Sequence, residues 1–342
     1  MARKLTVVVS QGQSANPAKR KLEEDVVAGL LFERSVDVTV IPHLYDLTPD
    51  ATGMLCLQGI TGDMVVLSWL FDRGAFWTLD RNDIRGREGK TLLISEADDE
   101  DDEDAGDDEA TADEKQRVAA ARDLPSRTIW CLDFKVRPDA KSFIDEVVRI
   151  RDENSAQIVS LGGLLSGLPI VTAPTPAPTT PVAPTQPTVI ADDGARRWYP
   201  VIDYSRCTNC MECIDFCLFG VYGVDKIDTI LVEQPDNCRK GCPACSRVCP
   251  ENAIIFPQHK TPAIAGSPEG SAGAFKIDLS RLFGAPDALE QAVLERDVEL
   301  VAVGRDAVGD SVGLPKRQEA TGPTAPKDDL DKLMDSLDDL TL

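Results

Sequence analysis

Two groups of cysteines, packed into one short segment, constrain this chain more than any other feature. The stretch RCTNCMECIDFC has the spacing C-x-x-C-x-x-C-x-x-x-C, and NCRKGCPACSRVCP has the spacing C-x-x-x-C-x-x-C-x-x-x-C. The two quartets are Cys207, Cys210, Cys213 and Cys217, then Cys238, Cys242, Cys245 and Cys249. A fold that contains this segment must bring thiols together in tight loops.

The surroundings of the cysteines favour metal or redox chemistry over disulfide bonds. The chain begins MARKLTVVVS, without the apolar region of a secretory signal, and no run of about 18 apolar residues follows. We therefore expect a cytoplasmic protein without a membrane span, where clustered cysteines usually bind metal. Cys56 and Cys131 stand apart in apolar runs, so we expect them to be core residues.

The spacing favours iron–sulfur clusters over zinc. Each quartet gives three thiolates in quick succession and then a fourth, which suits a cubane that takes three ligands from one loop and one from a more distant residue. Zinc sites usually present two separated pairs of ligands, so a zinc-stabilised interaction module is the weaker alternative. His43 and His259 lie outside the quartets, which gives no support to a Rieske-type site.

The quartets belong to an internal repeat in which an apolar strand, a cysteine loop and a second apolar strand follow one another twice. With Pro250 after the last cysteine, VID before the first quartet and CPENAI after the second, the segment from Tyr199 to Phe256 resembles bacterial-type ferredoxins with two [4Fe-4S] clusters. Two departures from that family are Leu218, where a proline is usual, and one extra residue before Cys242. Gly241 is expected to accommodate this extra residue with a positive φ.

The resemblance implies that the fourth cysteine of each quartet serves the other cluster. One cluster would be held by Cys207, Cys210, Cys213 and Cys249, and the other by Cys238, Cys242, Cys245 and Cys217.

Residues 1–160 alternate apolar strands with amphipathic helices. The predicted strands are LTVVVS, VDVTVI, DMVVLSWL, TLLIS and RTIWCLDF, and the predicted helices are RKLEEDVVAGLLFE and DAKSFIDEVVRIRD. Strands rich in Val, Ile and Leu that alternate with helices predict a parallel sheet covered on both faces. The expected fold class is therefore α/β: a three-layer N-terminal domain, followed by a small α+β ferredoxin-like domain with two clusters.

Amino-acid composition indicates the boundaries between the domains. The acidic stretch 96–114 is predicted to be a disordered insertion, and the Pro/Thr-rich stretch 168–195 a linker, so a fragment 190–265 is expected to fold alone. Residues 196–305 would form the ferredoxin-like domain with a C-terminal extension that contains a helix and a strand. The remainder, 306–342, would be a flexible tail that ends in a short amphipathic helix, which either docks on another protein or packs back onto this chain.

These features predict an electron carrier or a redox-complex subunit that works with a redox partner protein. An alternative is an oxidoreductase whose N-terminal domain binds a flavin or nucleotide, because VSQGQSANPAK resembles the flavin-phosphate loop of flavodoxin-like domains. That loop has only Gly12, so a simple strand-to-helix turn is the favoured interpretation. The formal net charge of −22 argues against a nucleic-acid partner.

Basic residues gather at the second cysteine loop. Arg239, Lys240 and Arg247 accompany that loop, whereas Asp203, Glu212 and Asp215 accompany the first. Because reduction adds negative charge, the second cluster is expected to have the higher potential.

Overall fold

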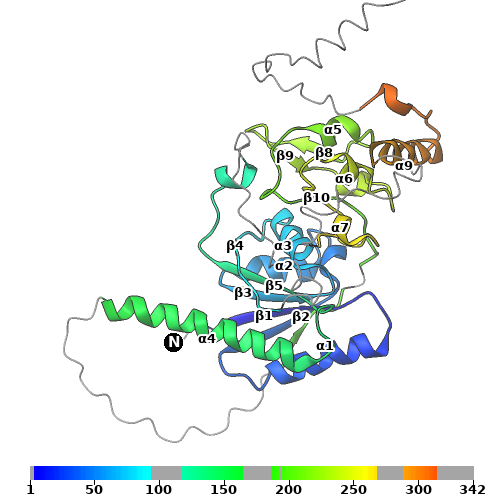
Figure 1. The fold of residues 1–342 in the computed structure, drawn as a ribbon. Coiled ribbons are helices and arrows are strands. Elements are labelled where there is room, and N and C mark those ends of the chain that lie inside the picture. The colour runs from blue at the N-terminus through cyan, green and yellow to red at the C-terminus, as the bar shows by residue number, and fades with distance from the viewer. Residues whose placement is uncertain (1–3, 94–116, 165–185, 193, 268–287, 314–342) are drawn as a thin grey trace, which may run out of the picture.

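The computed structural model describes residues 4–93, 117–164, 186–192, 194–267 and 288–313 (Figure 1). The predicted acidic insertion, most of the predicted linker and the predicted C-terminal docking helix lie outside these residues. Within the described part of the chain, no helix is both long enough and apolar enough to cross a membrane.

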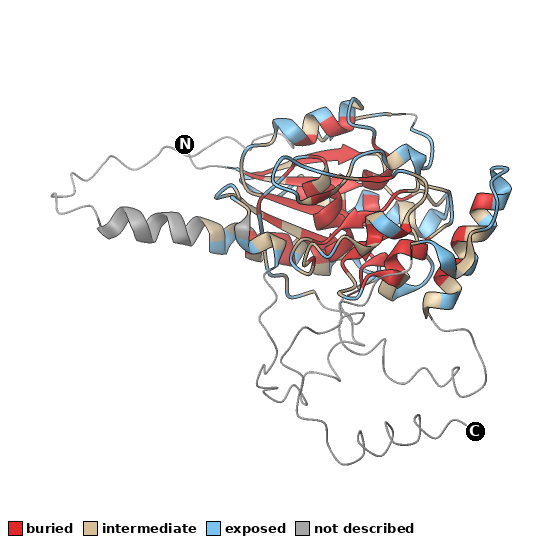
Figure 2. Cartoon of the chain, turned by 90° about the horizontal axis from the view of Figure 1, so that it is seen from above, coloured by how far each residue is buried: buried red, intermediate tan, exposed pale blue. Residues whose placement is uncertain are grey.

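The N-terminal part is built on one parallel sheet of six strands, which confirms the predicted α/β class. In spatial order the strands are β4 (Arg87–Glu88), β5 (Thr128–Asp133), β3 (Met64–Ser68), β1 (Leu5–Ser10), β2 (Val36–Ile41) and β6 (Thr188–Val189). All the pairings are parallel. Strand β1 lies inside the sheet and is covered on both sides, which is why its sequence contains a run of three valines rather than an alternation. Figure 2 shows strands coloured as buried in the interior of the molecule.

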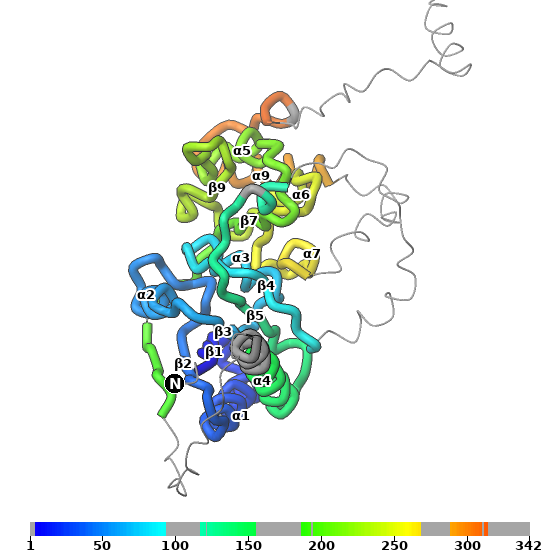
Figure 3. The backbone as a smooth tube through the Cα atoms, turned by 90° about the vertical axis from the view of Figure 1, so that its left-hand side faces the viewer, coloured from blue at the N-terminus to red at the C-terminus, as the bar shows by residue number. Residues whose placement is uncertain are grey.

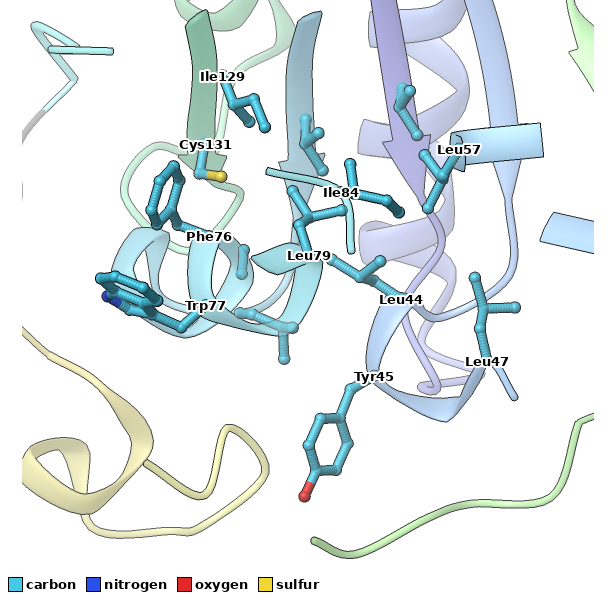
Figure 4. Close-up of a cluster of buried hydrophobic side chains, with 14 of the residues drawn as sticks. Leu44, Tyr45, Leu47, Leu57, Phe76, Trp77, Leu79, Ile84, Ile129 and Cys131 are labelled. Atoms are coloured by element: carbon cyan, nitrogen blue, oxygen red, sulfur yellow. The ribbon is translucent and has the colours of Figure 1, made fainter. Parts of the chain in front are cut away.

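Helices cover both faces of this sheet (Figure 3). On one face lie α1 (Pro17–Leu30) and α4 (Ala140–Leu164), which pack on each other and on β1, β2 and β3. On the other face lie α2 (Thr52–Gly59) and α3 (Asp72–Arg81), whose apolar side chains form a second core (Figure 4). The predicted three-layer arrangement is present.

Two predicted elements differ in this part of the chain. In TLLIS, the described residues 91–93 are not a strand: the edge position beside β5 is taken by β4, and the Leu92 amide donates to Glu146 on α4. The predicted linker 168–195 also extends too far. Its β-branched residues Thr188 and Val189 add β6 to the open edge of β2, where sequence composition alone had indicated only a Pro/Thr-rich spacer.

The cysteine segment forms a smaller module with two short antiparallel sheets. Its first half contains β7 (Val201–Ile202), α5 (Glu212–Phe216) and β8 (Tyr222–Val224). Its second half contains β9 (Ile230–Val232), the 3-10 turn η4 (Pro235–Asn237), α6 (Ala244–Val248) and β10 (Ile254–Ile255). Strand β7 pairs with β10, and β8 pairs with β9. The predicted repeat is therefore present, and each half supplies one strand to each sheet.

Two further helices follow the cysteine module: α7 (Pro262–Ala265) and α9 (Ala288–Ala302), with a final turn η6 (Gly309–Ser311). Helix α9 packs on α6. The predicted strand in this extension is wrong, because DVELVAV continues α9 as far as Ala302. Arg296 and Leu300 are buried at helical spacing, and packing on α6 outweighs the β-propensity of the valines.

The two parts of the molecule share a core. Tyr199, Val201 and Ile255 of the cysteine module belong to the same buried cluster as the side chains of α2 and α3. Tyr45, which follows β2, stacks on Tyr199 with ring centroids 4.2 Å apart. Such a shared core argues against the expectation that residues 190–265 fold alone.

Ion pairing also joins the two parts. Arg73 at the start of α3 donates through Nε to Asp203 Oδ2 at 2.5 Å and through a second nitrogen to the Asn252 carbonyl at 2.6 Å. In addition, a 3-10 turn η3 (Val118–Ala121) donates backbone hydrogen bonds to the Cys207 and Tyr204 carbonyls. The first cysteine loop is thus held from the α/β side.

Candidate functional site

The first cysteine loop turns sharply through left-handed residues. Asn209 and Met211 have φ values of 59° and 64°. The Asn209 side chain fixes this turn by accepting from the Ile230 amide at 2.9 Å and donating to the Asp228 carbonyl at 2.7 Å. Asparagine tolerates this conformation better than most residues, and such turns direct backbone N–H groups inward. The Asn209 amide indeed donates to Cys207 Sγ at 3.4 Å.

The second loop contains the extra residue that Gly241 was predicted to accommodate. Gly241 has a φ of +92°, and a Cβ there would meet no atom within 4 Å. The predicted positive φ is confirmed. A side chain at position 241 would therefore be disfavoured by the positive φ and not by contact with neighbouring atoms.

Three thiols of the first quartet lie within electrostatic reach of Cys249 from the second. Burial raises the pKa of Cys213 well above its ordinary value, and the charges of Cys249, Cys207 and Cys210 raise it further. Burial raises the pKa of Cys207 to about 11. The hydrogen bond from the Asn209 amide lowers this pKa, and the charge of Cys249 raises it. The Ala253 amide donates to Cys249 Sγ at 3.3 Å.

The other three thiols of the second quartet lie near Cys217 from the first. Burial raises the pKa of Cys245 well above its ordinary value, and the charges of Cys217 and Cys238 add to the effect. The pKa of Cys242 is raised to about 11 by burial, with Cys217 also acting on it. The fourth cysteine of each quartet is therefore brought to the other quartet.

A cavity opens at this second group. It is small, with a volume of about 20 Å³, and is partly open to solvent. Its walls include Cys217, Cys238, Cys242 and Cys245 together with aromatic rings such as Phe216 and Phe219. A hollow bordered by four thiols is the arrangement that a group bound through sulfur requires.

Tyr222 lies between the two groups of thiols. Its hydroxyl donates to Cys245 Sγ at 3.0 Å, and the residue is buried on β8. Burial raises the pKa of Tyr222 well above its ordinary value, and the charges of Cys245, Cys213 and Cys217 act in the same direction. Sequence reasoning missed this residue, and the only signal for it was a polar ring at an inward-facing position of an apolar strand.

Charges around the two groups are arranged differently from the sequence expectation. Asp203 beside the first loop is buried and paired with Arg73, which is distant in sequence. Arg296 of α9, also missed by sequence reasoning, is 1% exposed and lies at the wall of the second cavity with Arg239. Arg247 pairs with Glu295 at 3.0 Å.

The thiol groups do not have the form of a mononuclear metal site. Among the described residues, no three His, Cys, Asp or Glu side chains are arranged to hold a single metal ion. The zinc alternative thus gains no support from the geometry. The four thiols around one hollow, the backbone amides that donate to sulfur and the hydroxyl on Cys245 fit a group held through several sulfurs, since hydrogen bonds to sulfur are typical of such sites.

The remaining candidate residues have structural roles. Burial raises the pKa of Cys131 well above its ordinary value, so this thiol is a core residue as predicted. In the loop after β1, the Gly12 amide donates to Glu23 Oε1 at 2.8 Å, and the Gly12 carbonyl accepts from Arg20. This amide is therefore engaged within the chain, as expected of a strand-to-helix turn.

Comparison with known proteins gives one informative match. No protein-family model and no solved structure matches the chain. Together, fold and sequence define an α/β protein that contains a ferredoxin-like segment. A segment of 66 residues, 19% of the chain, is 52% identical to an uncharacterized ferredoxin of Methanocaldococcus jannaschii. The chain covers 44% of that protein, less than half of its length.

Proposed function

We propose that this protein transfers electrons through two [4Fe-4S] clusters, as a ferredoxin-like carrier or as a subunit of a redox complex. The observation that carries the proposal is that Cys249 lies near the first three thiols of the first quartet and Cys217 near the first three of the second. One cluster would be held by Cys207, Cys210, Cys213 and Cys249, and the other by Cys217, Cys238, Cys242 and Cys245. The match to a ferredoxin supports the electron-transfer role.

The chain's own residues would hold and tune the clusters. Thiolates in a buried setting are costly, as the raised pKa values of Cys213 and Cys245 indicate, and coordination to iron offsets that cost. Backbone amides at Cys207 and Cys249 and the Tyr222 hydroxyl at Cys245 would reduce the negative charge on sulfur. Each bound cluster would accept and release one electron.

A redox partner would exchange electrons near the first loop. Cys210 is exposed, in contrast to the buried Cys207 and Cys213 beside it. Electron transfer between proteins requires a cofactor near the surface, so Cys210 marks a suitable face. Clustered cysteines that bind metal are typical of reducing compartments, so the proposal includes a cytoplasmic location.

Metal and sulfide analysis of full-length protein, purified without oxygen, tests this function. We expect about eight iron and about eight acid-labile sulfide per chain, as two cubane clusters require. Electron paramagnetic resonance of the reduced protein would then show two interacting centres. Zinc without sulfide would contradict the proposal, and a bound flavin in the visible spectrum would favour the oxidoreductase alternative.

A further inference from the structure

A second pocket opens at the C-terminal ends of the sheet strands, away from the cavity at Cys217. It has a volume of about 420 Å³ and is open to solvent. Residues 12–14 after β1, 69–71 after β3 and Lys135 after β5 form one side of it. Residues 257–259, which follow β10, form another side, so the pocket lies where the two parts of the molecule meet.

The pocket lies at the point where the strand order reverses. From β1 the chain continues to β2 on one side, and the next strand, β3, lies on the other side of β1. The loops after β1 and β3 diverge at such a point and leave a crevice between them. In open parallel sheets, ligands bind in this crevice.

The wall of the pocket is cationic on a chain with a formal net charge of −22. Lys19, Lys135 and Arg196 line it, and no Asp or Glu does so among the described residues. Lys135 pairs with Asp133 at 3.0 Å. Within the described part of the chain, no carboxylate forms an ion pair with Lys19 or Arg196. These two cations are available to a ligand.

Carboxylates behind the wall have partners of their own. Glu23 lies 3.0 Å from Arg20, and Asp46 accepts from the Arg197 amide at 3.0 Å and from Gln258 at 3.0 Å. Arg20 therefore compensates Glu23, whereas the amide donors to Asp46 are neutral, so Asp46 offsets part of the positive charge of Lys19 and Arg196 and the pocket keeps a smaller net positive charge.

Aromatic rings complete the pocket, and their positions are fixed by the chain. Trp69 Nε1 donates to Glu23 Oε1 at 2.7 Å, and a Cβ at Gly12 would come within 2.7 Å of the Trp69 ring. Lys19 lies over the Trp69 ring at 4.3 Å and Lys135 over the Phe71 ring at 3.3 Å. Apolar surface and cations are therefore placed side by side before any ligand arrives.

His259 supplies a neutral donor. Its Nδ1 accepts from the Thr261 amide at 2.9 Å, which leaves the proton on Nε2. Burial also lowers the pKa of His259, which favours the uncharged ring. This ring adds a hydrogen-bond donor to the three cations.

We propose that this pocket binds a small molecule through a phosphate group, with the body of that molecule against Trp69 and Phe71. Several cations around one site match the double negative charge and multiple acceptor oxygens of phosphate better than the single charge of a carboxylate. This site is separate from the proposed cluster function and does not depend on it. The pocket is nevertheless close to the proposed cluster site. The ring centroid of His259 lies 6.2 Å from that of Trp198, and Trp198 Nε1 donates to the Cys242 carbonyl at 3.2 Å.

Isothermal titration calorimetry on the full-length protein tests the site with three probes: inorganic phosphate, AMP and FMN. We expect at least one to bind with a stoichiometry of about one, and the Lys19→Ala, Arg196→Ala variant to weaken that binding about tenfold or more. Lys21→Ala is the matched control, because Lys21 is a neighbouring lysine of α1 whose partner is Asp25. It should bind as the unmodified protein does.

The three probes separate the sources of the phosphate. Tighter binding of AMP or FMN than of inorganic phosphate indicates a nucleotide-like ligand, whereas equal or tighter binding of inorganic phosphate indicates the free anion. The proposal is overturned if none binds, or if the double variant binds as tightly as the Lys21→Ala control. Calorimetry does not measure iron, so its outcome is independent of whether the protein carries clusters.

Discussion

The hydroxyl of Tyr222 is the clearest single group that acts on a proposed cluster ligand. It donates to Cys245 Sγ at 3.0 Å. This hydrogen bond is stronger when the cluster carries the extra electron, so it favours the reduced form. Tyr222→Phe should lower the potential of the second cluster by about 30–60 mV, which corresponds to roughly 0.7–1.4 kcal/mol for one electron. A redox titration followed by electron paramagnetic resonance measures the shift, and an unchanged potential would contradict this role.

Exchange of ligands between the quartets is tested at Cys217. Because this thiol lies with Cys238, Cys242 and Cys245, Cys217→Ala should impair the second cluster and leave the first in place. The matched variant Cys213→Ala should have the opposite effect. Iron content and the resonance signals of each variant distinguish the two clusters. Loss of the first cluster in Cys217→Ala would show that each quartet serves only itself.

Charge near the second cavity carries a separate prediction. Asp203 is neutralised by Arg73 and Arg296 by Asp297, whereas Arg239 lines the second cavity with no carboxylate partner among the described residues, so the second cluster should still have the higher potential. The Arg239→Glu, Lys240→Glu variant should lower the potential of that cluster while the first hardly changes. Lys4→Glu, at an exposed pair with Asp37, serves as the control. Equal shifts of both clusters would rule out a local effect of charge.

At the scale of elements, α9 protects the second cavity. Ala292 is buried where α9 packs on α6, and Leu294 on the same helix is 59% exposed. Ala292→Glu places a charge in that interface and should speed the loss of iron to a chelator severalfold, because α6 carries Cys245. Leu294→Glu should lose iron at the rate of the unmodified protein. Equal rates in the two variants would mean that α9 does not shield the site.

The elements that could be predicted from sequence are those whose pattern is local. Runs such as LTVVVS and VDVTVI have the composition of strands covered on both faces, and they form β1 and β2. The strand β6 has only Thr188 and Val189, too few residues for a periodic signal. Its existence depends on the open edge of β2, which is distant in sequence.

The same distinction applies to the site. Cysteine spacing and Gly241 were sufficient to predict two loops and a positive φ, because both are local properties. Tyr222, Arg296 and Arg73 act across long sequence separations, and nothing in their own neighbourhoods distinguishes them from ordinary core or surface residues. Such contacts appear only when the whole fold is present.

At the scale of the whole molecule, the buried pair Arg73–Asp203 holds the two parts together. The side chains are 9% and 1% exposed. Arg73→Ala leaves the buried Asp203 carboxylate with only a longer pair to Arg206, at 3.6 Å, so it should lower the free energy of unfolding by about 3 kcal/mol. Arg85→Ala, which breaks an exposed pair with Asp83, should change it by about 1 kcal/mol or less. Denaturant unfolding measures the free energy of unfolding of both variants. Equal decreases in the two variants would contradict the structural role of the buried pair.

The pairing of β7 with β10 has a consequence for how the protein is made. Because Val201 pairs with Ile255, and Cys249 lies with the first quartet, neither group of thiols is complete until the ribosome has added nearly all of the cysteine segment. The α/β part, with Tyr45 and Arg73, is synthesised earlier and offers a surface on which the later segment closes. If the thiols hold iron as proposed, newly made chains should receive it late, after the last cysteine has left the ribosome.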